Sequence, residues 1–160
     1  MVIKVKKGNH YSSTLLDKFP FILFFKNRRE FTFQFLQSCR YDLGTQDQLD
    51  TNKLFGVSSL SGVHKNSARF GWRYNLDTEK IDLFSYLYLN GERRNHYIDS
   101  VNINQKVKLT IHWTKERVYF LFNDDLREYY KLNLGNIVLV NGLYFGGNRT
   151  APHDIEINRT

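Results

Sequence analysis

Two carboxylates come closest to forming a catalytic pair in this sequence. Glycoside hydrolysis uses two carboxyl groups on one surface, and residues two apart on a β-strand share a face. Glu79 and Asp82 lie three apart in the segment EKIDLF, so a regular strand would point them to opposite faces. The next glutamate, Glu92, lies beyond a predicted hairpin. This spacing argues against a glycosidase.

Other catalytic and metal-binding patterns are missing as well. The sequence contains no G-x-S-x-G elbow, no phosphate-binding G-x-x-x-x-G-K-[ST] loop and no H-E-x-x-H pair. The histidines lack metal-ligand spacing, and the single cysteine cannot build a disulfide framework; these residues are His10, His64, His96, His112, His153 and Cys39. The sequence therefore predicts no catalytic residue, no metal, no cofactor and no enzymatic activity.

A polar corner near the end of the chain has two interpretations. Asn148, His153 and Asp154 could together hold a cation or a sugar hydroxyl, since carboxylate and amide oxygens are suitable hard ligands. Alternatively, Asp154 accepts backbone N–H groups while Pro152 fixes the turn. We favour the second interpretation.

Aromatic and basic residues on strand faces provide the other candidate site. Arg69 and Arg73 alternate with the apolar residues of their segment, and Tyr86 and Tyr88 alternate with leucines in theirs. If the two strands are neighbours, these four side chains share one surface that binds a partner protein or a glycan. The alternative is that the two tyrosines belong to a second small core.

The elements that must position these residues are strands, because apolar residues recur at every second position. This pattern marks strands at 31–35, 67–75, 80–89, 107–113 and 118–122, with a further strand at 127–132. Asn90-Gly91 is typical of a type I′ hairpin turn. Inward alternation predicts seven side chains for the core: Phe33, Phe70, Trp72, Leu109, Ile111, Trp113 and Phe120. A polar surface loop is expected at 41–53, and one or two helical turns at Ser12 to Phe19.

Length and composition favour one folded domain over residues 1–160. The net charge is +7, which suits an anionic partner, but the basic residues lie in short, separate clusters. The longest apolar run, Phe19 to Phe25, is too short to cross a bilayer, and the first residues lack the apolar region of a signal peptide. We therefore expect no membrane partner and, because no signal peptide is present, a cytoplasmic location.

Three segments resemble the last strands of concanavalin A-like, laminin-G-type sandwiches: VKLTIHW, RVYFLFNDD and LYFGGN. Trp113 matches the tryptophan that ends a strand in that fold, and Gly146-Gly147 matches its late corner. The resemblance covers the C-terminal two thirds of the chain. It implies an all-β, antiparallel two-sheet sandwich or jelly roll. Endo-glucanases with an E-x-D-x-x-E strand share the fold, and that pattern is absent here.

A second resemblance concerns the segments HKNSARFGWR and YFGGNRTAPHDI, which are similar to segments of small bacterial and bacteriophage proteins. It implies a non-enzymatic bacteriophage virion component that assembles with itself or with other structural proteins. Two alternatives remain open: a lectin-like carbohydrate-binding domain, and a basic protein associated with nucleic acid.

Overall fold

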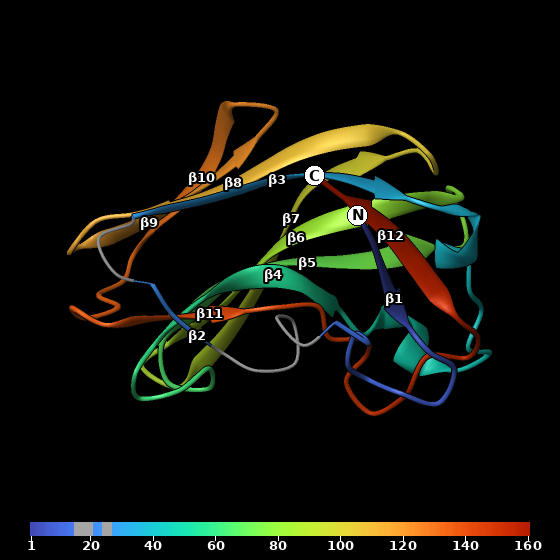
Figure 1. Cartoon of the computed structure of the whole chain (residues 1–160), viewed down its shortest axis with the longest axis horizontal. Coiled ribbons are helices and arrows are strands. Elements are labelled where there is room, and N and C mark those ends of the chain that lie inside the picture. The colour runs from blue at the N-terminus through green and yellow to red at the C-terminus, as the bar shows by residue number, and fades with distance from the viewer. Residues whose placement is uncertain (15–20, 24–26) are drawn as a thin grey trace.

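Two antiparallel six-stranded sheets face each other in the computed structural model, which describes residues 1–14, 21–23 and 27–160 (Figure 1). In spatial order, sheet A contains β1 (Val2–Val5), β12 (Ile155–Arg159), β3 (Arg28–Phe35), β8 (Lys106–Trp113), β9 (Arg117–Phe122) and β10 (Asp125–Lys131). Sheet B contains β2 (Phe21–Leu23), β11 (Val138–Asn141), β4 (Asn52–Ser59), β5 (Ser67–Asn75), β6 (Lys80–Leu89) and β7 (Glu92–Val101). The predicted all-β two-sheet sandwich is therefore confirmed.

The core lies between the sheets and is rich in aromatic rings. Phe55 stacks between Phe33 and Phe70, with ring centroids 5.4 and 5.5 Å away. Phe70 meets Phe120 of sheet A edge-on at 5.1 Å, which joins the two layers. All seven side chains predicted for the core are buried: Phe33, Phe70, Trp72, Leu109, Ile111, Trp113 and Phe120. Alternation of apolar residues along each strand is sufficient to place them there.

The central hairpin has the turn that the sequence predicts. Asn90 and Gly91 both have positive φ, 54° and 89°, and Leu89 pairs with Glu92 across the turn. Strands β5 and β6 both have the predicted bounds. Because β5 and β6 are directly paired, Arg69 and Tyr86 face each other in register.

The sequence prediction was wrong at the end of the 41–53 loop, because β4 begins at Asn52. Both polar residues at its start are buried, and each has a hydrogen bond. Asn52 donates to the Tyr41 hydroxyl at 2.8 Å, and Lys53 donates to the Gly146 carbonyl at 3.1 Å. The preceding segment contains short 3-10 helices at Gln37–Cys39 and Gln46–Leu49. Lys53 finds its partner 93 residues away, which explains why local composition was misleading there.

The predicted helix at Ser12 to Phe19 lies mostly outside the described residues. Ser12 itself forms an isolated β-bridge with Val5. In the part of the chain that the structure describes, no helix is long and apolar enough to cross a membrane.

The first testable prediction concerns the core. Phe120→Ala should lower the free energy of unfolding by about 3–5 kcal/mol, because it removes a fully buried ring and leaves a cavity. Leu126→Ala is the control, since Leu126 is 54% exposed, and should change stability by less than about 0.5 kcal/mol. Urea denaturation measures both. A loss below about 1 kcal/mol for Phe120→Ala would contradict its place in the core.

Candidate functional site

A row of polar side chains crosses the outer face of sheet B, the face turned away from the core. Direct cross-strand pairing aligns Asn141 of β11, Gly56 of β4, Arg69 of β5, Tyr86 of β6 and Asn95 of β7. Along β11, β4, β5 and β6 these positions alternate with buried residues, so the pleat directs them outward. Asn95, on the exposed edge strand β7, joins the row by pairing with Tyr86. The five strands therefore bring residues from distant parts of the chain onto one surface.

Gly56 gives Arg69 its place in this row. A Cβ atom at Gly56 would lie 2.4 Å from Cγ of Arg69 and 2.3 Å from the Ala68 carbonyl oxygen. Any larger residue would therefore push the arginine side chain away. With glycine there, the guanidinium carbon of Arg69 lies 4.9 Å from the centroid of the Tyr86 ring. This cation–π contact holds the charge at the centre of the row.

Arg69 is buried and lacks a full set of partners. Only 8% of its surface is exposed, and its Nε atom has no hydrogen-bond partner among the described residues. The ion pairs found in the described chain do not include Arg69. Burial lowers its pKa, although an arginine keeps its charge in proteins. A buried charge with a free donor is costly, and a bound anion would offset part of that cost.

Lys53 places a second cation beside Arg69. Its Nζ atom lies 4.9 Å from the Tyr86 ring centroid and 5.5 Å from that of Tyr144. The described chain provides no ion pair for it either. Burial, reinforced by the neighbouring Arg69 charge, lowers the pKa of Lys53 to about 8. Near that pH the amine exchanges readily between its charged and neutral forms, as a general base must.

These two cations line a cavity of about 560 Å³, together with Tyr86 and residues of the loops above the sheet. The other lining residues are Tyr11, Val63, His64, Asn141, Gly142, Leu143, Tyr144, Gly147 and Asn148. No Asp or Glu is among the described residues that line it. The cavity is therefore cationic and aromatic, and it contains donors for an anionic ligand.

Tyr144 is held firmly at one wall of the cavity. Its backbone exchanges hydrogen bonds with Lys53, at 2.8 and 2.9 Å. Its ring stacks on His10 at 5.0 Å and meets Tyr11 edge-on at 5.0 Å. Burial and the neighbouring Tyr11 raise the pKa of Tyr144, so its hydroxyl keeps its proton at neutral pH. The hydroxyl is therefore present as a hydrogen-bond donor at this wall.

The structure brings four of the seven predicted site residues to this region. Arg69, Tyr86 and Asn148 line the cavity. Tyr88 lies next to it, with its ring 6.1 Å from Tyr86 and 5.2 Å from His64. The shared surface that the alternation predicted for Arg69 and the two tyrosines is present.

Arg73 is on the same face but is already neutralised. Its guanidinium pairs with Asp82 at 3.6 Å and lies over the Phe84 ring. Asp82 also accepts a hydrogen bond from Asn75 at 2.9 Å. Glu79, in the turn before β6, pairs with Arg40 at 3.5 Å. Asp82 and Glu79 are thus engaged separately and do not line the cavity.

His153 and Asp154 also lie outside the cavity, and their contacts are structural. His153 Nε2 is 2.8 Å from the Ser38 carbonyl oxygen. Asp154 accepts a hydrogen bond from the Lys7 backbone N–H and pairs with Lys4 at 3.1 Å. These contacts tie the N-terminus to the last strand. They match the second interpretation of the corner, in which Asp154 accepts a backbone N–H.

Sequence reasoning missed Lys53 and Tyr144, which come from segments predicted to be a loop and a corner. Lys53 directly precedes the apolar residues LFGV, which indicates that it belongs to a buried strand rather than to the loop. The signal for Tyr144 was the following Gly146-Gly147, which allows the loop to fold closely onto Asp50. Neither signal indicates a site without knowledge of the pairing partners.

Comparison with known proteins identifies the fold through structure alone. No protein-family model matches the sequence, and no curated protein matches it. The alginate lyase AlyC3 is similar, with a TM-score of 0.61, 9% identity, and coverage of 99% of this chain and 72% of that one. A further structure of AlyC3 is a complex with dimannuronate. The endo-1,3-β-glucanase (laminarinase) catalytic domain from Thermotoga petrophila has a TM-score of 0.56 at 9% identity, covering 99% and 73%.

A glycosyl hydrolase family protein from Mycobacterium fortuitum is also similar, with a TM-score of 0.56, 14% identity, and coverage of 99% and 72%. Together these structures confirm the concanavalin A-like sandwich. They contradict the prediction of a non-enzymatic virion component, because the proteins that share the fold over nearly the whole chain are carbohydrate-active enzymes. The resemblance to bacteriophage proteins finds no support among them.

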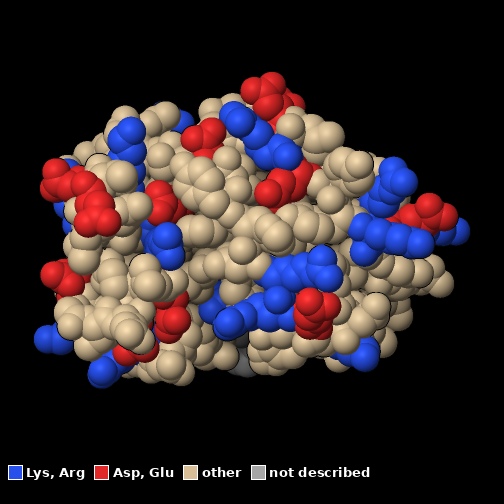
Figure 2. Space-filling view, turned by 180° about the vertical axis from the view of Figure 1, so that it is seen from behind, with Lys and Arg blue, Asp and Glu red and all other residues tan. Residues whose placement is uncertain are grey.

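The surface charge gives no sign of an extended basic patch on the face shown in Figure 2. There Lys and Arg lie in separate groups, interspersed with Asp and Glu. A nucleic-acid backbone is bound by a continuous positive surface. The positive charge that matters for the candidate site is local and buried, at Lys53 and Arg69.

The second prediction concerns the cost of burying Lys53. At pH 7 the Lys53 amine is charged in both the unfolded and the folded chain. Only folding removes this charge from water, and that desolvation lowers the free energy of unfolding. Lys53→Met should therefore raise the free energy of unfolding by about 1–3 kcal/mol. The stability difference between Lys53→Met and the parent should shrink as pH rises from about 8 towards 10.5. In this range Lys53 is neutral in the folded parent but still protonated in the unfolded chain, so the parent becomes more stable as pH rises.

The control for this prediction is Lys80→Met, which changes an exposed lysine at the start of β6. It should leave stability nearly unchanged at every pH. Urea denaturation at pH 7, 9 and 10 measures the difference. A destabilising Lys53→Met would show that the amine serves the fold rather than a ligand.

Proposed function

We propose that this chain is a carbohydrate-active enzyme that cleaves a uronate-containing polysaccharide in the cavity on the outer face of sheet B. The observation that carries the proposal is Arg69, a buried guanidinium with an unsatisfied Nε and no described ion-pair partner. The likeness to the alginate lyase AlyC3, one structure of which contains dimannuronate, supports the choice of substrate class.

A sugar carboxylate supplies what this cavity lacks. Guanidinium and carboxylate form charge-assisted hydrogen bonds that are stronger than neutral ones. An anion bound beside Arg69 and Lys53 also offsets their mutual repulsion, which lowers the pKa of Lys53. The rings of Tyr86 and Tyr144 provide apolar surface for the sugar ring. A neutral polysaccharide brings no negative charge to offset the two buried cations.

The lining residues favour elimination over hydrolysis. Hydrolysis with two carboxyl groups requires a pair across the scissile bond, and no described carboxylate lines the cavity. In elimination, Arg69 stabilises the negative charge that develops on the uronate carboxylate. The neutral amine of Lys53 takes the proton from the adjacent ring carbon. The carbon–oxygen bond to the leaving sugar breaks as a carbon–carbon double bond forms.

Tyr144 completes this scheme as the general acid. Its hydroxyl donates a proton to the departing oxygen, so no charged alkoxide is released. The raised pKa of Tyr144 keeps that proton in place before the reaction. After product release, Lys53 returns its proton to solvent and Tyr144 regains one, which restores the starting state.

The third prediction is eliminative cleavage. The protein should release products with the ultraviolet absorbance of an unsaturated uronate from alginate, polygalacturonate or hyaluronan. Arg69→Met should lower kcat/KM on the order of 10²-fold or more, because it removes the stabilising charge. Arg94→Met is the matched control, since this exposed arginine on β7 points to the other face and changes net charge equally.

Three outcomes would overturn the proposal. New reducing ends without ultraviolet absorbance would indicate hydrolysis and a different set of catalytic residues. Binding of these polymers with no cleavage at any pH between 6 and 10 would rule out the enzymatic role. Equal activity of Arg69→Met and Arg94→Met would show that Arg69 is not the anion receptor.

A further inference from the structure

Three aromatic side chains form a row on the opposite surface, the outer face of sheet A. His112 of β8 pairs with Tyr119 of β9, and Tyr119 pairs with Tyr129 of β10. Their ring centroids are 5.7 and 6.1 Å apart, and each ring is tilted 32° from the next. We call these residues the aromatic row. It runs across the strands, on the side of sheet A away from the core.

The aromatic row is not needed for the fold. Tyr129 exposes 59% of its surface, whereas its neighbour Tyr130 points inward and contacts Phe120 in the core. Large exposed aromatic side chains that line up in register on a sheet mark a binding surface more often than a random surface residue does. Leu126, which is also exposed on β10, belongs to the adjacent row, opposite Leu121.

Positive charge borders one end of the row. The guanidinium carbon of Arg117 lies 5.7 Å from the Tyr129 ring centroid, and Arg117 pairs across the strands with Lys131. Both are exposed, and neither takes part in the ion pairs of the described residues. A partner bound to the row would therefore meet two cations that no described carboxylate neutralises.

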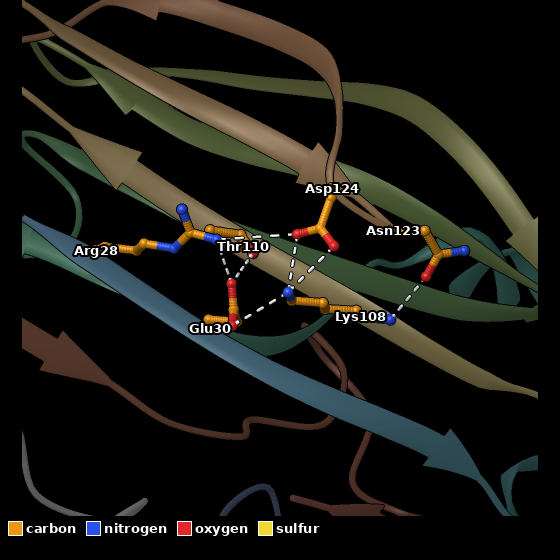
Figure 3. Close-up of polar contacts among 6 residues, drawn as sticks. All are labelled: Arg28, Glu30, Lys108, Thr110, Asn123 and Asp124. Carbon is orange, nitrogen blue, oxygen red and sulfur yellow. Dashed lines mark hydrogen bonds and ion pairs between the residues drawn. The ribbon is translucent and has the colours of Figure 1, made fainter.

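Two other basic residues of sheet A, Arg28 and Lys108, are already paired with carboxylates, as Figure 3 shows. Arg28 contacts Glu30, and Lys108 pairs with Glu30 at 3.4 Å and with Asp124 at 2.9 Å. Thr110 donates a further hydrogen bond to Glu30 at 3.0 Å. The network balances two cations against two carboxylates. The net positive charge beside the aromatic row thus comes from Arg117 and Lys131.

We propose that the aromatic row is a second glycan-binding surface, which holds an anionic polysaccharide chain across β8, β9 and β10. Tyrosine and histidine rings pack against the apolar faces of sugars, while Arg117 and Lys131 attract the carboxylates of the same chain. The polymer class rests on the proposed function of the cavity in sheet B. The surface itself does not, because it lies on the other sheet and shares no residue with the cavity.

A second binding surface would raise the local concentration of polymer near the cavity. A long chain held on sheet A can present further segments to sheet B without leaving the protein. A short oligosaccharide cannot reach both surfaces. The aromatic row should therefore matter for long substrates only.

The fourth prediction tests this inference with the double variant Tyr119→Ala/Tyr129→Ala. Retention of the protein in native gels that contain alginate should weaken about tenfold or more, since two ring contacts are lost. Cleavage of long alginate should fall, while cleavage of a trimeric or tetrameric uronate should stay unchanged. Leu126→Ala is the matched control, an exposed apolar residue on the same strand, and should behave as the parent.

Further measurements separate the possible outcomes. Arg69→Met leaves the aromatic row intact, so its retention in the gel should fall less than that of the double variant, and loss of cleavage alone would not count against the aromatic row. Circular dichroism and the single variant Tyr129→Ala check that the effect is not unfolding. Unchanged retention of the double variant overturns the inference. Equal retention of the parent protein in gels of neutral laminarin also overturns it, because the surface would then not select an anionic polymer. A dimer in light scattering that the double variant abolishes overturns it too, because the aromatic row would then bind a second copy of the chain.

Discussion

Two cations, Lys53 and Arg69, are buried next to each other on sheet B without an ion pair to any described carboxylate. Desolvation and mutual repulsion both oppose this arrangement, so the surrounding structure must hold it in place. Gly56 leaves the space for Arg69, the Tyr86 ring lies against both cations, and the Gly146 carbonyl accepts a hydrogen bond from Lys53. The cost is consistent with a ligand that brings negative charge.

In the sandwich, the inward side chains of each strand form the core, and the outward side chains of the same strand are available for the site. Inward positions of β5 and β6 carry Phe70, Trp72 and Leu87, which bury a continuous core. Outward positions of the same strands are free to carry Arg69 and Tyr86. A rigid core beneath the row keeps the polar groups in register, which a binding site on loops alone would not achieve. The same division operates on sheet A, where Phe120 points inward and Tyr119 outward.

Much of the fold followed from the sequence, since strands such as Ser67–Asn75 alternate clearly and Asn90-Gly91 requires a tight turn. Part of the candidate site followed too, because alternation placed Arg69 and Tyr86 on one face. Lys53 and Tyr144 did not, since their burial depends on contacts between segments about 90 residues apart, which no local pattern encodes. The prediction that the chain is not an enzyme failed for a related reason. That prediction rested on known catalytic motifs, whereas the cations and tyrosines that line this cavity come from five separate segments.

The central claim is that Arg69 is a receptor for a sugar carboxylate. Titration calorimetry can compare a short oligouronate with the same oligosaccharide after its carboxyl groups have been reduced to alcohols. We expect the parent protein to prefer the acidic form by about tenfold to a hundredfold, a difference of about 1.5–3 kcal/mol for a charged hydrogen bond. Arg69→Met should lose that preference. Equal affinity of the parent protein for both forms would contradict the account.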